Sequence, residues 1–312
     1  MRIIVTGALG HIGSRLIRDL PFLFPGCEIV LVDNLMTQRY CSLFNLPKEG
    51  NFNFIEADIT QMELPPLLAG THVVIHLAAI TDAAGSFDRA EQLEQNNFNA
   101  TNRLAEACAE GGMRLLTLSS TSVYGTQAKL VDEGCSEEEL KPQSPYATIK
   151  LKEERLLQQL VEEKGLKACI FRFGTIFGVS PGMRFHTAVN KFCWQAVFGQ
   201  PITVWNTAFE QKRPYLDLID AVRAIAFAIQ LDLFAGQIYN VVTLNATVRQ
   251  VVEAIRYHVP ALQVAFVDSL IMNQLSYEVQ NNRFSEAGFK VSGSLEQGIT
   301  DTINLLKNSA NR

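Results

Sequence analysis

The architecture of this chain is predicted by Arg2-Ile3-Ile4-Val5-Thr6-Gly7-Ala8-Leu9-Gly10-His11-Ile12-Gly13. A short β-branched run leads into three regularly spaced glycines, and an apolar stretch that runs toward Pro21 follows as a helix. Such glycines let the backbone approach a pyrophosphate closely, and the helix amino end offers unpaired N–H groups. We therefore expect Gly7, Gly10, His11, Ile12 and Gly13 to bind a dinucleotide. A tight turn whose small residues serve only packing is the alternative interpretation.

An acidic residue follows the glycines at the distance expected for a residue that binds the adenosine ribose of a dinucleotide. Asp33 ends a second apolar run, 20 residues after Gly13. Its carboxylate would accept hydrogen bonds from the ribose hydroxyls and repel a 2′-phosphate, which predicts NAD rather than NADP. We place Asn34, which follows it, among the cofactor-binding residues. Further along, Asp58 and Ile59 are candidates to meet the adenine, and Leu77, Ala78 and Ala79 are small enough for the cofactor to lie against the backbone.

Short β-branched runs alternate with amphipathic stretches through the first half of the chain. We expect strands at 3–7, 28–33, 52–58, 72–79, 114–120 and 167–173, and helices at 86–110 and 145–164. Repeated βαβ units predict a Rossmann-type, doubly wound α/β fold with a parallel sheet covered by helices. After about residue 175 the alternation of strand-like and helix-like segments becomes less regular. We therefore expect residues 1–174 to form an NAD-binding domain, with segments near 213–243 returning to it, and 175–312 to form mostly a smaller substrate-binding lobe.

Composition excludes several classes of function. The 312 residues carry a net charge of −5, so no basic face for nucleic acid is expected. The apolar run at the start is shorter than the signal-peptide core of about 7 to 15 residues. The longest uncharged stretch, 192–209, is interrupted by polar residues, which argues against a membrane span. The six cysteines include no Cys-x-x-Cys pair, which predicts no metal site and reduced thiols in a cytoplasmic protein.

A second group of residues carries acid–base chemistry. Ser144-Pro145-Tyr146-Ala147-Thr148-Ile149-Lys150 has a helix cap followed by proline in the first turn, and Gly165 is placed to end the same helix. Tyr146 and Lys150, four residues apart, share one face. The ammonium can stabilise phenolate and so lower a pKa that is about 10 in the free side chain. Tyr146 is thus a candidate general base, although the same spacing is common on ordinary amphipathic helices.

Several further motifs occur in order along nearly the whole chain. They are TGALGHIG (6–13), HLAA (76–79), LSSTSVYG (118–125), YATIK (146–150), FRFGTIFG (171–178), MRFHTAVNKF (183–192), RPYLDLIDAVRAI (213–225) and IYNV (238–241). Together they resemble the extended short-chain dehydrogenase/reductases, in particular the NAD-dependent nucleotide-sugar epimerase/dehydratase branch. The resemblance implies that Tyr146 is the acid/base and that Lys150 supports it and binds the nicotinamide ribose. It also implies that Ser120, or less favourably Thr121, binds the reacting hydroxyl.

The residues before Val123-Tyr124-Gly125 separate the reactions of this family. Its 4,6-dehydratases carry Thr-Asp-Glu there, and related decarboxylases carry Glu at the position of Ser122. Here Ser120-Thr121-Ser122 offers only hydroxyls. Both branches are disfavoured because proton transfer at a neighbouring carbon lacks its carboxylate. The resemblance therefore favours an epimerase, most simply a 4-epimerase, in which Tyr146 deprotonates a sugar hydroxyl while hydride passes to nicotinamide and later returns.

The resemblance also implies a nucleotide-diphosphate sugar as substrate. Arg213 and Asn190 match positions that contact the diphosphate in relatives, although either residue could be structural. Thr175 stands where galactose epimerases have an Asn that touches the diphosphate, and we place Thr81 among the substrate-binding residues. No Arg or Lys occurs between residues 257 and 282, where relatives place a phosphate-binding Arg. Arg256 or Arg283 is the candidate substitute.

Two further implications concern support and assembly. Asn97 matches the family Asn that holds backbone and a water near the active site. The helices around 98–110 and 146–163 match those that form a four-helix interface in relatives, so we expect a homodimer, although the same apolar stripes could cover the sheet. Two rival functions remain: a net dehydrogenase resembling L-threonine dehydrogenases, and a regulator that binds NAD without turnover.

Overall fold

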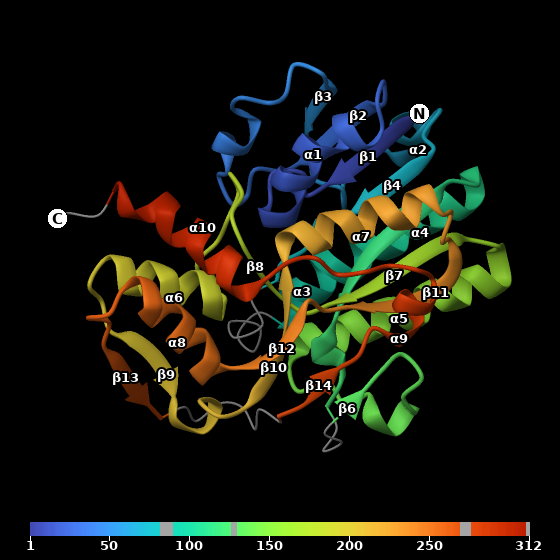
Figure 1. Ribbon diagram of the computed structural model, residues 1–312. Coiled ribbons are helices and arrows are strands. Elements are labelled where there is room, and N and C mark those ends of the chain that lie inside the picture. Colours follow the sequence, from blue (N-terminus) through green and yellow to red (C-terminus); the bar gives the residue numbers. More distant parts are fainter. Residues whose placement is uncertain (82–89, 126–129, 269–275, 310–312) are drawn as a thin grey trace.

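The computed structural model describes residues 1–81, 90–125, 130–268 and 276–309. Its centre is a seven-stranded sheet in the order β11-β7-β5-β4-β1-β2-β3, and every neighbouring pair is parallel (Figure 1). The strands are β1 (Arg2–Thr6), β2 (Glu28–Asp33), β3 (Asn51–Glu56), β4 (Val73–His76), β5 (Arg114–Ser120), β7 (Lys167–Phe173) and β11 (Ala235–Val241). The strand order reverses between β1 and β4, which confirms the doubly wound fold and puts the expected ligand crevice at the carboxyl ends.

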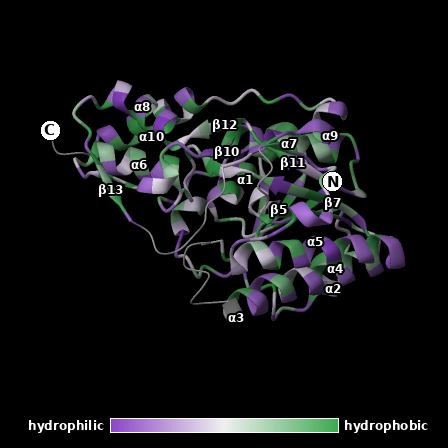
Figure 2. Ribbon diagram, turned by 90° about the horizontal axis from the view of Figure 1, so that it is seen from below, coloured by the Kyte–Doolittle hydropathy of each residue, from purple (hydrophilic) through white to green (hydrophobic). Residues whose placement is uncertain are grey.

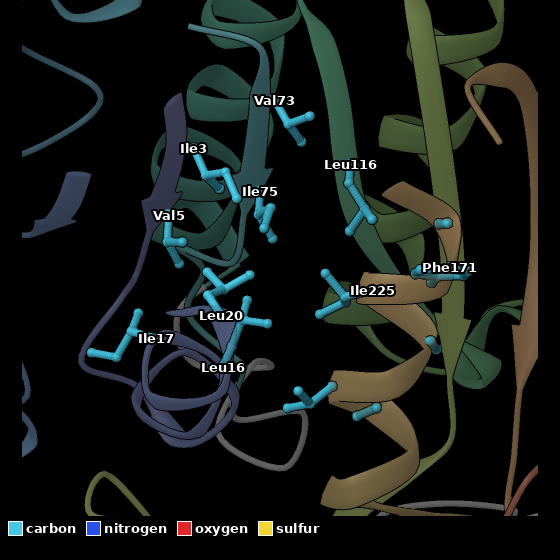
Figure 3. Close-up of a cluster of buried hydrophobic side chains, with 14 of the residues drawn as sticks. Ile3, Val5, Leu16, Ile17, Leu20, Val73, Ile75, Leu116, Phe171 and Ile225 are labelled. Atoms are coloured by element: carbon cyan, nitrogen blue, oxygen red, sulfur yellow. The ribbon is translucent and has the colours of Figure 1, made fainter. Parts of the chain in front are cut away.

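Alternate residues of the strands pack against helices on opposite faces. Ile3 and Val5 belong to one buried cluster (Figure 3), and Ile4 belongs to another. Because successive side chains of a strand point to opposite faces, the near-continuous apolar runs are explained by burial on both sides. Figure 2 shows helices on both sides of the strands. The first cluster includes α1 (His11–Leu23) and α7 (Leu218–Gln230), and the second includes α2 (Leu64–Leu68), α4 (Asn99–Gly111) and α5 (Pro145–Lys164).

The helices begin and end largely where the sequence predicts. Ser144 caps α5 by accepting a hydrogen bond from the amide of Ala147 at 3.2 Å, and Gly165 ends that helix with φ of +67°. The first helix continues through Pro21 to Leu23. In the predicted helix 86–110, residues 86–89 lie outside the described part. The rest is interrupted, since α3 (Ala90–Leu93) and a π-helical turn, η3 (Glu94–Phe98), precede α4.

The C-terminal lobe has a core of its own. The helices α6 (Ala188–Val197), α8 (Val248–His258) and α10 (Leu295–Lys307) share a buried cluster with short strands. These strands are β8 (Thr175–Phe177), β10 (Lys212–Asp217) and β12 (Leu244–Thr247) in one sheet, and β9 (Ile202–Trp205) and β13 (Val264–Val267) in another. The other short elements are η1 (Tyr40–Leu43), η4 (Thr121–Val123), β6 (Leu130–Val131), η5 (Glu137–Glu139), η6 (Asn206–Ala208), β14 (Glu278–Val279) and α9 (Asn282–Glu286).

Within the described ranges, none of the helices combines the length and apolarity needed to cross a bilayer. The same part of the chain holds no group of His, Cys, Asp and Glu side chains suited to a metal ion. All six cysteines are free thiols, and four of them are buried. The fold is therefore held by packing and polar contacts, without a disulfide.

After α7 and β11 have returned to the seven-stranded sheet, the chain reaches the core of this sheet once more at Phe284. This side chain of α9 is fully buried in the cluster that contains β1 and α1. Its ring centroid lies 5.2 Å from that of Phe171 on β7 and 5.2 Å from that of Tyr239 on β11. Residues near the end of the chain thus complete the core of the part that begins it.

Phe284→Ala is expected to reduce the free energy of unfolding by roughly 3–5 kcal/mol, because it leaves a cavity among aromatic rings. Tyr257→Ala is the matched control: Tyr257 is 84% exposed, so its loss should change stability by no more than about 0.5 kcal/mol. Chemical denaturation followed by circular dichroism measures both. Equal, small losses for the two variants would show that α9 does not pack on the sheet.

Candidate active site

A cavity of about 560 Å³ opens at the carboxyl ends of the central strands, against the C-terminal lobe. It adjoins a smaller hollow of about 120 Å³, and both are lined by Gly7, Gly10, Arg39, Leu77 and Ala79. Residues directly after β1, β4, β5 and β7 line the larger cavity, as the strand order leads one to expect. The two hollows therefore form one extended site.

The glycine turn forms the floor between the two hollows. Gly7 has φ of +66°, and a Cβ there would lie 2.6 Å from the amide nitrogen of Ala78. A Cβ at Gly13 would lie 2.5 Å from the carbonyl oxygen of Gly7. Gly10 precedes α1, and His11, Ile12 and Gly13 of its first turn line the larger cavity. Amides of a first helical turn lack intrahelical partners, so this cradle fits the diphosphate of a dinucleotide.

The smaller hollow has the polar groups that an adenosine half requires. Asp33 accepts hydrogen bonds from the amides of Leu9 and Leu35, each at 3.0 Å, and lines this hollow. Asn34 donates to Asp58 at 3.2 Å. Burial alone would raise the pKa of Asp58, but hydrogen bonds from Thr60 and Asn34 lower it, so the carboxylate stays ionised. The other predicted residues of this part, Ile59, Leu77, Ala78 and Ala79, also line it.

His11 joins the glycine turn to the C-terminal lobe. Its Nδ1 lies 2.8 Å from Ser180 Oγ, and the ring is 4% exposed. Burial, reinforced by Arg184, lowers the pKa of His11 to about 3, so the ring is neutral. Gly182 donates from its amide to Ser14 Oγ at 2.9 Å, and a Cβ there would lie 2.2 Å from the carbonyl oxygen of Leu9. The segment 180–182 therefore closes tightly over the turn.

Tyr146 and Lys150 both line the larger cavity, one helical turn apart on α5. Lys150 is 6% exposed. Burial by itself lowers the pKa of Lys150, but the charges of Glu153 and the nearby Tyr146 raise it above the ordinary value. The lysine therefore remains a cation beside the tyrosine, which is the arrangement a phenolate base requires.

Ser120 reaches the same cavity from the end of β5. Its Oγ accepts hydrogen bonds from the amide of Ser122 at 3.2 Å and from Ser122 Oγ at 2.9 Å. In this arrangement the Ser120 proton is available for a group in the cavity. Thr121 also lines the cavity, but its hydroxyl donates to the carbonyl oxygen of Phe173 at 3.4 Å. The geometry supports Ser120 over Thr121.

A buried ion pair fixes α5 against the sheet beside these residues. Glu154 of α5 accepts two hydrogen bonds from the Arg172 guanidinium of β7, at 2.6 and 2.9 Å. Ser119 of β5 donates to the same carboxylate, and Tyr124 accepts from Arg172 at 3.0 Å. Burial alone lowers the pKa of Arg172, but hydrogen bonding to Glu154 raises it well above its usual range. Together these bonds tie β5 and β7 to α5, and β5 and α5 carry the candidate catalytic groups.

The predicted substrate-binding residues separate into two groups. Thr81, Thr175 and Arg213 line the larger cavity, and the Arg213 guanidinium lies 5.6 Å from the ring centroid of Tyr277. Asn190 is absent from the described lining and is fully buried. Its amide bonds the backbone of Gly178 and the carbonyl oxygen of Arg184, the latter at 3.2 Å. Asn190 therefore shapes the segment that carries Arg184 instead of reaching a ligand directly.

Four basic residues of the cavity, arginine, histidine and lysine, were missed by the sequence reasoning. They are Arg39, Arg184, His186 and Lys191. Three of them lie in MRFHTAVNKF, the motif from which only Asn190 was selected. The two suggested substitutes for a phosphate-binding arginine lie elsewhere: Arg256 is near Glu253, and Arg283 donates to the carbonyl oxygens of Ile238 and Glu133. They contact other parts of the fold, so neither is among the described cavity residues.

Asn97 supports the floor of the smaller hollow. Its Oδ1 accepts from the amide of Ile80 at 2.8 Å, and its Nδ2 donates to the carbonyl oxygen of Ile80 at 2.9 Å. The side chain is 1% exposed, so these bonds satisfy buried polar groups on both sides. Asn97 thus fixes the backbone that follows β4, next to Thr81.

Comparison with known proteins agrees with this geometry. An uncharacterized UDP-glucose epimerase of Bacillus subtilis (strain 168) is 31% identical over 249 residues, covering 77% of this chain and 76% of that protein. A trifunctional UDP-glucose 4,6-dehydratase, 3,5-epimerase and reductase of Arabidopsis thaliana is 28% identical; it matches 96% of this chain, which spans 46% of that protein.

Among solved structures, a UDP-glucuronic acid 4-epimerase from Bacillus cereus in complex with UDP-glucuronic acid and NAD superposes with a TM-score of 0.87. The two chains are 26% identical, and the match covers 99% of this chain and 100% of the other. Residues 3–241 match the family described as NAD dependent epimerase/dehydratase. That match covers most of the chain and contains the glycine turn, Ser120, Tyr146 and Lys150. The chain therefore belongs to the NAD dependent epimerase/dehydratase family.

Proposed function

We propose that this protein is an NAD-dependent 4-epimerase of a nucleoside-diphosphate sugar. One observation carries the proposal: Ser120, Tyr146 and Lys150 meet in a cavity whose described lining contains no Asp or Glu. A dehydratase needs a further acid and base to remove water at a neighbouring carbon. An epimerase needs only the groups that move a proton on one hydroxyl, and these are present.

Each of the three side chains has a distinct task in this proposal. When bound, NAD would supply reversible hydride transfer at one sugar carbon: loss of hydride would give a transient keto sugar, and return of hydride to the opposite face would invert that carbon. Tyr146 takes the proton from the hydroxyl on that carbon and later returns it. Ser120 donates a hydrogen bond to the same oxygen, and Lys150 favours the phenolate form of Tyr146 through its charge.

The charge of the larger cavity supports an anionic substrate. Arg184, Lys191 and Arg213 line it together with Lys150, although the chain as a whole is acidic with a net charge of −5. Guanidinium groups suit phosphate and carboxylate oxygens because they donate in pairs. The solved relatives in complex with UDP-glucuronic acid or UDP-glucose support a UDP-linked hexose or hexuronic acid as the substrate.

The protein should be purified with NAD bound and should interconvert two nucleotide sugars without net reduction. Denaturing it and measuring the released dinucleotide tests the first part. Chromatography of reactions with UDP-, GDP- and dTDP-linked hexoses and hexuronic acids tests the second. Net NADH formation with L-threonine would favour the dehydrogenase alternative, and bound NAD with no turnover of any sugar would favour the regulator.

Tyr146→Phe should lower kcat by about 10²–10⁴-fold, because the base is lost while the ring and its packing remain. NAD retention and the thermal midpoint should stay close to those of the wild type. Tyr40→Phe is the matched control, since Tyr40 is 53% exposed and outside the described lining of both hollows. Similar activity for the two variants would remove Tyr146 from the role of base.

The homodimer stays a prediction from the family resemblance. The apolar residues of α4 and α5 pack mainly on the sheet. Exposed ion pairs join α5 to η3 through Lys152–Glu94 and to α4 through Lys164–Glu106. We therefore expect a dimer with a polar interface, weakened by added salt. Sedimentation equilibrium at low ionic strength should give twice the monomer mass of 34.7 kDa. A monomer mass at all protein concentrations would contradict it.

A further inference from the structure

A buried carboxylate that the proposed reaction does not use lies directly on the active-site lysine. Glu153 follows Lys150 by one turn of α5, and its Oε2 lies 2.8 Å from Lys150 Nζ. The two side chains are 5% and 7% exposed. The other oxygen of Glu153 is also buried, and Thr101 of α4 lies beside the carboxylate. A buried charge of this kind interacts strongly with its neighbours.

We propose that Glu153 is a positioning residue that holds the Lys150 ammonium and offsets part of its charge, and so sets the pH range in which Tyr146 acts as the base. This inference rests on the proposed function, because it assigns Tyr146 and Lys150 their roles. It adds a residue that the Tyr-x-x-x-Lys motif does not include.

The surroundings of Lys150 leave Glu153 as its direct counter-ion. From α5, Tyr146, Glu153 and Glu154 face it, and from β4, His76 does. Burial, with a smaller effect of Lys150, lowers the pKa of His76 to about 3, so that ring is neutral. Glu154 is already bonded to Arg172.

The contact with Glu153 leaves the Lys150 ammonium able to make the other hydrogen bonds that its proposed role requires. An ammonium has three donors, and Glu153 takes one of them. Two remain for the cofactor ribose and for the phenol oxygen. Along α5, Tyr146 precedes Lys150 by one turn and Glu153 follows it by about one turn. Glu153 can therefore hold the end of the long Lys150 side chain without taking the place of Tyr146.

Lys150 and Glu153 have opposite effects on the ionisation of the Tyr146 phenol. The Lys150 cation favours phenolate, whereas the Glu153 anion disfavours it by like-charge repulsion. Glu153 also raises the pKa of Lys150, against the effect of burial. Removing the negative charge should therefore make Tyr146 ionise at lower pH, and should let Lys150 lose its proton at lower pH as well. Both limbs of the pH–rate profile should move in the same direction.

In Glu153→Gln, we expect the acid and alkaline limbs of kcat/KM to move to lower pH, each by about one pH unit. Glu153→Asp keeps the charge and should restore the wild-type profile in large part. Glu162→Gln is the matched control, because it replaces an exposed carboxylate of the same helix by a carboxamide. It should leave both limbs of the pH–rate profile unchanged. A lower rate at every pH, with both limbs unmoved, would show that Glu153 only stabilises the fold and would overturn the proposal.

A second measurement does not depend on turnover. The near-ultraviolet phenolate absorbance of the purified protein, minus that of Tyr146→Phe, reports the ionisation of Tyr146 alone. In the Glu153→Gln background the same difference should titrate at lower pH. If Glu153→Gln does not fold, Glu153→Asp should still show the titration displaced in the same direction by less, because its charge lies further from Lys150.

The two measurements separate this inference from the proposed function. A displaced phenolate titration with no turnover of any nucleotide sugar would contradict the epimerase function and support the role of Glu153. Epimerase activity with an unchanged phenolate titration and unchanged limbs of the pH–rate profile would support the proposed function and contradict the role of Glu153.

Discussion

The buried pair of Arg172 and Glu154 is the interaction on which the active site depends. It joins β7 to α5, and Ser119 brings β5 into the same set of hydrogen bonds. Breaking a buried pair by removing one partner leaves an uncompensated charge, which costs about 3–5 kcal/mol. Because Ser120 follows Ser119 and Tyr146 begins the helix that carries Glu154, this one contact sets the distance between hydroxyl and base.

The close approach of the C-terminal lobe to the glycine turn is a second constraint. Gly182 fits against Leu9 only because it lacks a side chain, and Ser180 reaches His11 through the same approach. The segment that carries Arg184 toward the cavity is thereby anchored on the glycine turn. The two adjoining hollows form one extended site because the two halves of the fold meet at backbone distance.

Charge is distributed unevenly in this molecule. The chain as a whole has a net charge of −5, whereas the described lining of the larger cavity is cationic and contains no carboxylate. Two carboxylates lie behind the lining: Glu153 pairs with Lys150 of the cavity, and Glu154 pairs with Arg172 of β7. The cavity thus attracts anions, and Glu153 compensates the buried charge of Lys150.

Local features of the sequence determined the parallel sheet, the glycine turn, the cap at Ser144 and the shared face of Tyr146 and Lys150. Each depends on residues within one or two turns of each other, or on the period of a strand. Only the tertiary structure decided that Arg39 and Arg184 line the cavity, that Asn190 is fully buried, and that the C-terminal segment completes the first core. Those outcomes depend on contacts between residues far apart in the chain, which spacing and composition cannot specify.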